Sequence, residues 1–77
     1  MDPDLRLDVL GFRCPVPVSA TRRALEERTE GVLEVLSDDP ETLVDLPLLI
    51  GRMRRRLISV QTVHREHRFL IDMAVDA

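Results

Sequence analysis

Aromatic residues, lysine and long apolar runs are scarce or absent in this 77-residue chain. It has no tryptophan, no tyrosine and no lysine, and Phe12 and Phe69 are its only phenylalanines. Such a chain offers no stacking platform for successive bases, which argues against direct binding of single-stranded nucleic acid. Its longest apolar run, residues 48–50, is far shorter than the ~20 residues of a membrane helix, so we expect no membrane partner.

The single cysteine, Cys14, excludes an internal disulfide and a zinc site built from several thiolates. A lone thiol fits a reducing cytoplasm, and the acidic stretch 1–4 lacks the positive charge of a secretion signal. With 44% hydrophobic and 32% charged residues, the composition is that of an ordinary soluble domain. We therefore expect one cytoplasmic domain over residues 1–77.

Charge is distributed unevenly along the chain. The net charge is −3, but residues 26–45 carry eight acidic side chains against one arginine, and residues 51–68 carry six arginines against one glutamate. Such a division either orients a protein partner through complementary potentials or reflects two solvated helix faces. The sequence leaves both interpretations open.

Hydrophobic periodicity predicts six elements in the order β-α-β-α-β-β. Leu5, Leu7 and Val9 alternate with polar residues, which is typical of a half-buried strand. Apolar residues at helical spacing then predict a helix over about 17–28, ended by Gly31.

The second half of the chain predicts a further helix and three strands. An aspartate cap and a proline in the first turn mark a helix start at residues 38–41. Pro47 must kink or divide this helix, and Asp45 is able to cap its later part. The strands cover residues 32–36, 58–63 and 69–73, the last two joined across 64–68. For so small a chain, the simplest fold is a two-layer α/β sandwich.

The segment around Cys14 carries the candidate chemistry. Cys14 follows a strand and a glycine turn and comes just before a helix, and Pro15 and Pro17 stiffen its loop. We expect the helix to begin at Pro17, since a proline disfavours helical geometry at the residue before it. The helix N-terminus, with the amides of Val16 and Val18, would then stabilise a thiolate.

Nearby arginines would act in the same direction. Arg13 lies beside the sulfur in the chain, and Arg22 or Arg23 follows on the helix, so each would lower the pKa of the thiol. Reactive cysteines occur in such electropositive, partly exposed places. The alternative for Cys14 is a small buried hydrophobe.

Residues 11–17, Gly-Phe-Arg-Cys-Pro-Val-Pro, resemble the Cys-Pro-x-Pro signature of the TusA/SirA sulfur-carrier family. The resemblance continues through Thr21, Ala24-Leu25, Gly31, Asp38-Asp39-Pro40 and Asp45-Leu46-Pro47. It implies a four-stranded mixed sheet with two helices on one face. It also implies that Cys14 accepts a sulfane sulfur as a persulfide from a cysteine desulfurase or rhodanese and passes it to a downstream acceptor protein.

The resemblance further implies a carrier that relays sulfur without a cofactor, rather than a multiple-turnover enzyme on a small substrate. A single thiol suits this role, because a second one nearby would resolve the persulfide as a disulfide. Such a carrier requires no general base, and none is evident in the sequence. Val16 replaces the glutamate often found between the prolines of tRNA-thiolation members, and the last hairpin lacks the glycine expected there.

Several other assignments remain open. Arg22 and Arg23 are candidates for docking the sulfur donor, because they follow Cys14 by one to two helical turns. A regulatory or RNA-binding module that uses the arginines of residues 52–56 is the main alternative to a carrier. A thiol redox protein is disfavoured by the absence of a resolving cysteine. A metal site of Cys14 with His64 and His67 is disfavoured because the histidines fall on a predicted hairpin, so no metal is expected.

Overall fold

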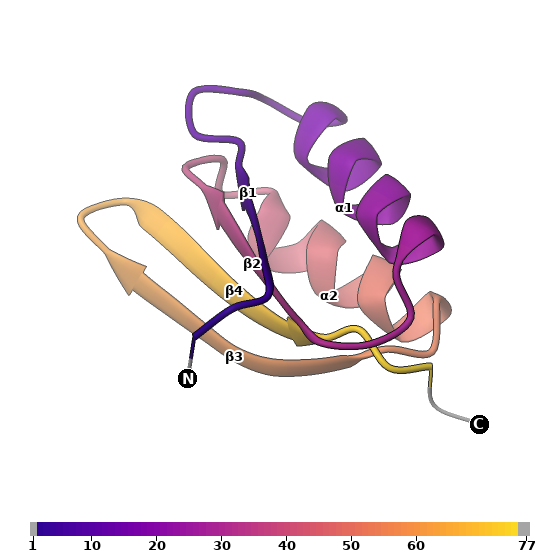
Figure 1. Cartoon of the computed structure of the whole chain (residues 1–77). Helices are drawn as coiled ribbons and strands as arrows, with labels where there is room; N and C mark the ends of the chain where they lie inside the picture. The colour runs from indigo at the N-terminus through magenta and orange to yellow at the C-terminus, as the bar shows by residue number, and fades with distance from the viewer. Residues whose placement is uncertain (1, 76–77) are drawn as a thin grey trace.

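Strands and helices alternate in the computed structural model as the sequence predicts. The structure describes residues 2–75. Its elements are β1 (Leu5–Asp8), α1 (Val16–Glu27), β2 (Val32–Ser37), α2 (Thr42–Arg52), β3 (Arg56–Val63) and β4 (Glu66–Asp72). The two helices lie next to each other over one face of the sheet (Figure 1). The predicted two-layer α/β sandwich is therefore confirmed, and no helix of residues 2–75 is long and apolar enough to cross a membrane.

The four strands form one mixed sheet in the order β1-β2-β4-β3. β1 pairs with β2 in parallel, from Leu5 opposite Leu33 to Asp8 opposite Leu36, and the other two pairings are antiparallel. Because β1 and β2 run the same way, both end at the same edge of the sheet. The loops that follow them, residues 9–15 and 38–41, meet there.

Alternation along the two central strands builds the core. Leu33 and Val35 of β2 and Phe69 and Ile71 of β4 are fully buried against the helices. The intervening residues point to the uncovered face, where the buried carboxylate of Glu34 is flanked by two arginines. The helices complete the core with residues that include Ala24, Leu25, Leu46, Leu49 and Ile50.

Helix α1 begins and ends earlier than predicted. It starts at Val16, one residue before Pro17, and Arg28 is its C-cap, so Gly31 does not end it. Gly31 instead lies in the left-handed region with φ +96°, where an added Cβ would come 2.8 Å from a carboxylate oxygen of Asp4. That oxygen accepts a hydrogen bond from the amide of Val32 at 2.7 Å, which aligns the start of β2 with the N-terminal segment.

Helix α2 is not divided at Pro47, which excludes one of the two predicted effects of this proline. It runs continuously from Thr42 to Arg52, with Pro47 inside it. Asp45 therefore lies within the first turn of the helix and does not cap a later part of it. Its side chain can therefore contact the loop between β1 and α1.

The last hairpin is tighter than predicted. Val63 pairs directly with Glu66, so only His64 and Arg65 form the turn. Both have positive φ, 50° and 69°. This is the geometry that a two-residue hairpin turn needs and that glycine or asparagine usually supplies. The expected glycine is thus replaced by two residues that adopt left-handed geometry.

Candidate functional site

Cys14 lies in the β1–α1 loop, and two consecutive aspartates from the end of β2 hold that loop in place. The amide of Gly11 donates to Asp38 Oδ1 at 3.0 Å, and the amide of Cys14 donates to Asp39 Oδ2 at 2.8 Å. The parallel pairing of β1 and β2 creates this contact, because it brings the loops after both strands to one edge of the sheet. The backbone at Cys14 is thus fixed by a carboxylate 25 residues away in the chain.

Asp39 anchors both the cysteine loop and the start of α2. Its second carboxylate oxygen accepts the amide of Glu41 at 3.0 Å, and its backbone carbonyl accepts the hydroxyl of Thr42 at 2.6 Å. The amides of Glu41 and Cys14, in that order, hold the pKa of the Asp39 carboxyl below its ordinary value. Glu41 is the N-cap of α2 and no side chain caps the helix, so the predicted aspartate cap is wrong. Asp39 instead holds the turn just before the helix, and its bond to Cys14 adds a second role.

The cysteine sulfur faces a carboxylate. Cys14 Sγ is half-buried and donates a hydrogen bond to Asp45 Oδ2 at 3.5 Å. Sγ and carboxylate oxygens of Glu41 and Asp45 all lie within 4.8 Å of one another. Partial burial first, then the hydrogen bond to Asp45 and the negative charges of Asp45, Glu41 and Asp39, raise the pKa of the Cys14 thiol.

The expected lowering of the thiol pKa is therefore wrong in direction. Arg13 is 70% exposed, and its Nη1 lies 3.9 Å from Asp38 Oδ1. Its positive charge helps to lower the pKa of Asp39 rather than that of Cys14. The amide of Val16, expected to face the sulfur, donates to the carbonyl of Arg13 at 3.0 Å. The carboxylates that come close to Sγ in the folded chain therefore affect the thiol pKa more than Arg13, which is next to Cys14 in the sequence.

A groove between α1 and α2 opens at the sulfur. It encloses about 180 Å³, and its lining consists of Cys14, Pro15, Val18, Arg22, Asp45, Leu48, Leu49 and Arg52. The thiol and Asp45 thus share one hollow with two arginines. Of the two arginines named as docking candidates, Arg22 lines the groove, whereas Arg23 pairs with Glu27 at 3.4 Å. Arg52 was not expected there.

The remaining arginines near the end of α2 do not form one free basic surface. Arg55 donates to the carbonyls of Met53 and Leu25, each at 2.6 Å. Arg56 pairs with Asp72 at 3.4 Å. These contacts engage Arg55 and Arg56, two of the four arginines on which an RNA-binding interpretation of residues 52–56 depends.

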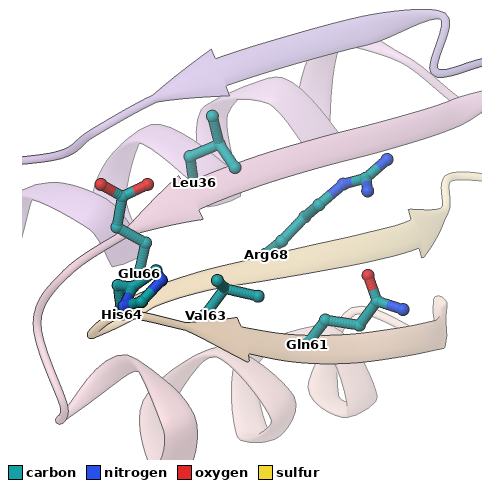
Figure 2. Close-up of a pocket in the computed structure, with 6 residues that line it drawn as sticks. All are labelled: Leu36, Gln61, Val63, His64, Glu66 and Arg68. Atoms are coloured by element: carbon teal, nitrogen blue, oxygen red, sulfur yellow. The ribbon is translucent and has the colours of Figure 1, made fainter.

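The two histidines do not join the cysteine. His67 is buried, and its Nδ1 lies 2.9 Å from the hydroxyl of Thr62. His64 lies at the hairpin turn and lines a hollow of about 250 Å³ on the uncovered face of the sheet (Figure 2). Within residues 2–75, the one group of potential metal-ligating side chains is Cys14 with Glu41 and Asp45. The histidine-based metal site is therefore wrong in its geometry.

Asp45 is the residue of the site that sequence reasoning misassigned. The sequence did point to this residue, since Asp45-Leu46-Pro47 is one of the segments that carry the family resemblance. Position alone suggested a cap, because an aspartate before a helical proline is a common one. Only the packing of α2 against the cysteine loop places this carboxylate on Sγ.

Comparison with known proteins matches these features to one family. A family model described as sulfurtransferase TusA matches residues 5–72, which span every strand and helix of the fold. The chain is also similar to the crystal structure of a SirA-like protein from Desulfitobacterium hafniense, with 25% sequence identity and a TM-score of 0.81. That similarity covers 91% of this chain and 97% of that chain.

Proposed function

Because this chain belongs to the TusA sulfurtransferase family, we propose that it carries sulfur as a persulfide on Cys14 and relays it between two partner proteins. The observation that carries this proposal is the position of the chain's single thiol. Cys14 is half-buried at the mouth of a groove, on a loop fixed by Asp38 and Asp39. A partner reaches it from solvent, and no second thiol of the chain competes for the bound sulfur.

The transfer needs no net oxidation. A cysteine desulfurase or rhodanese presents a persulfide, and Sγ of Cys14 bonds to its terminal sulfur while the donor's sulfur–sulfur bond breaks. The onward step has the same polarity, since a thiol of the acceptor protein attacks the outer sulfur of the Cys14 persulfide and Sγ of Cys14 leaves as the thiol. Each step exchanges one thiol and one persulfide, so atoms and electrons balance.

Docking of the donor and acceptor is sequential in this scheme. Both must reach the same groove, which one small domain cannot present to two large proteins at once. Arg22 and Arg52 line the groove beside Cys14 and are exposed, so they are placed to attract an acidic surface of a partner. The acceptor serves tRNA thiolation, molybdenum-cofactor maturation or sulfur oxidation, and Val16 between the prolines weakens the first of these. We assign the relay to the reducing cytoplasm, where a lone thiol persists.

Intact-protein mass spectrometry tests the proposal. The protein is incubated with a cysteine desulfurase, pyridoxal phosphate and cysteine, or with a rhodanese and thiosulfate. We expect a gain of one sulfur atom that a reductant removes and that Cys14→Ser, a near-isosteric control, does not show. Failure of the wild-type protein to gain sulfur from either donor would contradict the carrier function.

A further inference from the structure

The carboxylate of Asp45 is the only side chain of residues 2–75 that hydrogen-bonds to Cys14 Sγ, at 3.5 Å. It lines the same groove as the sulfur, together with the apolar side chains of Val18, Leu48 and Leu49. Helix α2 fixes it there, since the first turn of the helix is tied to the cysteine loop through Asp39. An ionised carboxylate can only accept, so the thiol proton points toward it.

We propose that Asp45 is a catalytic residue of sulfur transfer, which takes the proton from Cys14 Sγ as the sulfur attacks the donor's persulfide. This inference rests on the proposed carrier function. The nucleophile in persulfide exchange is the thiolate, whereas partial burial and then the acidic neighbours raise the pKa of the resting Cys14 thiol and keep it protonated. A base in contact with the sulfur resolves this conflict, because it removes the proton only when the electrophile is in place.

The step balances in atoms and electrons. The electron pair of Sγ forms the bond to the terminal sulfur of the donor persulfide, and the Sγ proton moves to Asp45 Oδ2. The pair of the broken sulfur–sulfur bond leaves with the donor's inner sulfur, which takes the proton from Asp45. Asp45 is thereby returned to its ionised form, and the donor leaves as a free thiol.

The rates of two reactions of the Cys14 thiol distinguish a catalytic role of Asp45 from a purely electrostatic or structural one. Alkylation by iodoacetamide releases iodide, which no acid can assist, whereas transfer from a small-molecule persulfide such as glutathione persulfide releases a basic thiolate sulfur, which receives the proton from Asp45 in the proposed step. Asp45→Asn removes the negative charge and the base. It should therefore speed alkylation at neutral pH, because the thiol ionises more readily, and slow sulfur loading by about tenfold or more.

Glu41→Gln is the matched control. It removes a second nearby negative charge, but Glu41 does not donate to or accept from Sγ, so alkylation should rise while loading is not slowed. The pH profile adds a readout that a purely structural role would not move. In Asp45→Asn the loading rate should grow with the thiolate fraction, so its gap to wild type closes at high pH.

Each outcome is decisive for the Asp45 role. Opposite changes in alkylation and loading support it, whereas faster loading in Asp45→Asn would make the carboxylate a mere electrostatic neighbour and overturn it. Parallel losses in both reactions, or no loss of loading, would overturn it as well. Glutathione persulfide needs no protein docking, so this comparison stands even if the wild-type protein gains no sulfur from desulfurase or rhodanese.

Discussion

The Arg55 guanidinium links the end of α2 to the end of α1, and its removal should destabilise the fold. Its two terminal nitrogens donate to the carbonyls of Met53 and Leu25, each at 2.6 Å. A hydrogen bond from a charged donor contributes about 1.5–3 kcal/mol to stability. Its Nε is buried and has no hydrogen-bond partner among the described residues, a cost of about 1–3 kcal/mol that truncation relieves.

The balance of these effects predicts that Arg55→Ala lowers the free energy of unfolding by about 2 kcal/mol. For a domain of this size, each kcal/mol shifts the melting temperature by about 4–8 °C, so the melting temperature should fall by roughly 8–16 °C. Thermal unfolding and urea titration, both followed by far-UV circular dichroism, measure the two quantities. Arg55→Lys should recover only part of the loss, because one ammonium does not reproduce the planar fork of donors that reaches two carbonyls.

Arg54→Ala is the control for this prediction. Arg54 is exposed and lies next to Arg55 in the same basic run, so its truncation should change stability by no more than about 0.5 kcal/mol. Equal stability of the two alanine variants would refute the reasoning, because it would show that the Arg55 hydrogen bonds contribute nothing. In that case Arg55 would be free for a partner, and the RNA-binding interpretation would regain support.

Three further predictions concern the cysteine site. Arg22→Glu should slow loading of Cys14 by a protein donor by about tenfold, with added salt narrowing the gap, and Arg23→Glu should have little effect because Arg23 pairs with Glu27 away from the groove. Equal effects of the two reversals in stopped-flow loading would contradict this placement. Asp39→Asn should speed amide hydrogen exchange at Cys14 more than Asp38→Asn does, because only Asp39 accepts the Cys14 amide. Since the folded-state pKa of Asp39 is lowered, its stabilising contribution is present above its unfolded pKa of about 3.9 and is lost as the pH falls through the lowered value. Wild type should therefore lose more stability than Asp39→Asn on acidification, and parallel acid titrations of the two would contradict this.

Local patterns predicted the elements of this fold well, because each depends on residues close in the chain. The alternation of Leu5 and Leu7 and the apolar faces of the helices are properties of single segments. Where the elements end or turn was predicted less accurately, because some residues depart from the conformational preference of their type. Pro47 is tolerated inside α2, and His64 and Arg65 take a turn geometry that usually favours glycine.

Charge was the property that the sequence predicted least well, because its effect depends on distances across the fold. The acidic segment 26–45 and the basic segment 51–68 partly neutralise each other in the folded chain. Glu34 of the first lies buried beside Arg68 of the second and Arg6 of β1. The formal charges of the two segments therefore overstate the potentials that a partner meets.

At the groove, acidic and basic side chains both lie close to the Cys14 thiol. Asp45 and Glu41 lie at the sulfur, and Arg22 and Arg52 line the same hollow. Partial burial and then these acidic side chains raise the pKa of the resting thiol, so Cys14 stays protonated and is slow to react with electrophiles that diffuse past it. In the proposed relay, Arg22 and Arg52 attract a partner with an acidic surface, and that partner brings the persulfide to the thiol with which Asp45 is in contact. The proposed relay therefore predicts selectivity for the donor protein over small oxidants, because acidic and basic side chains lie together around a single sulfur atom.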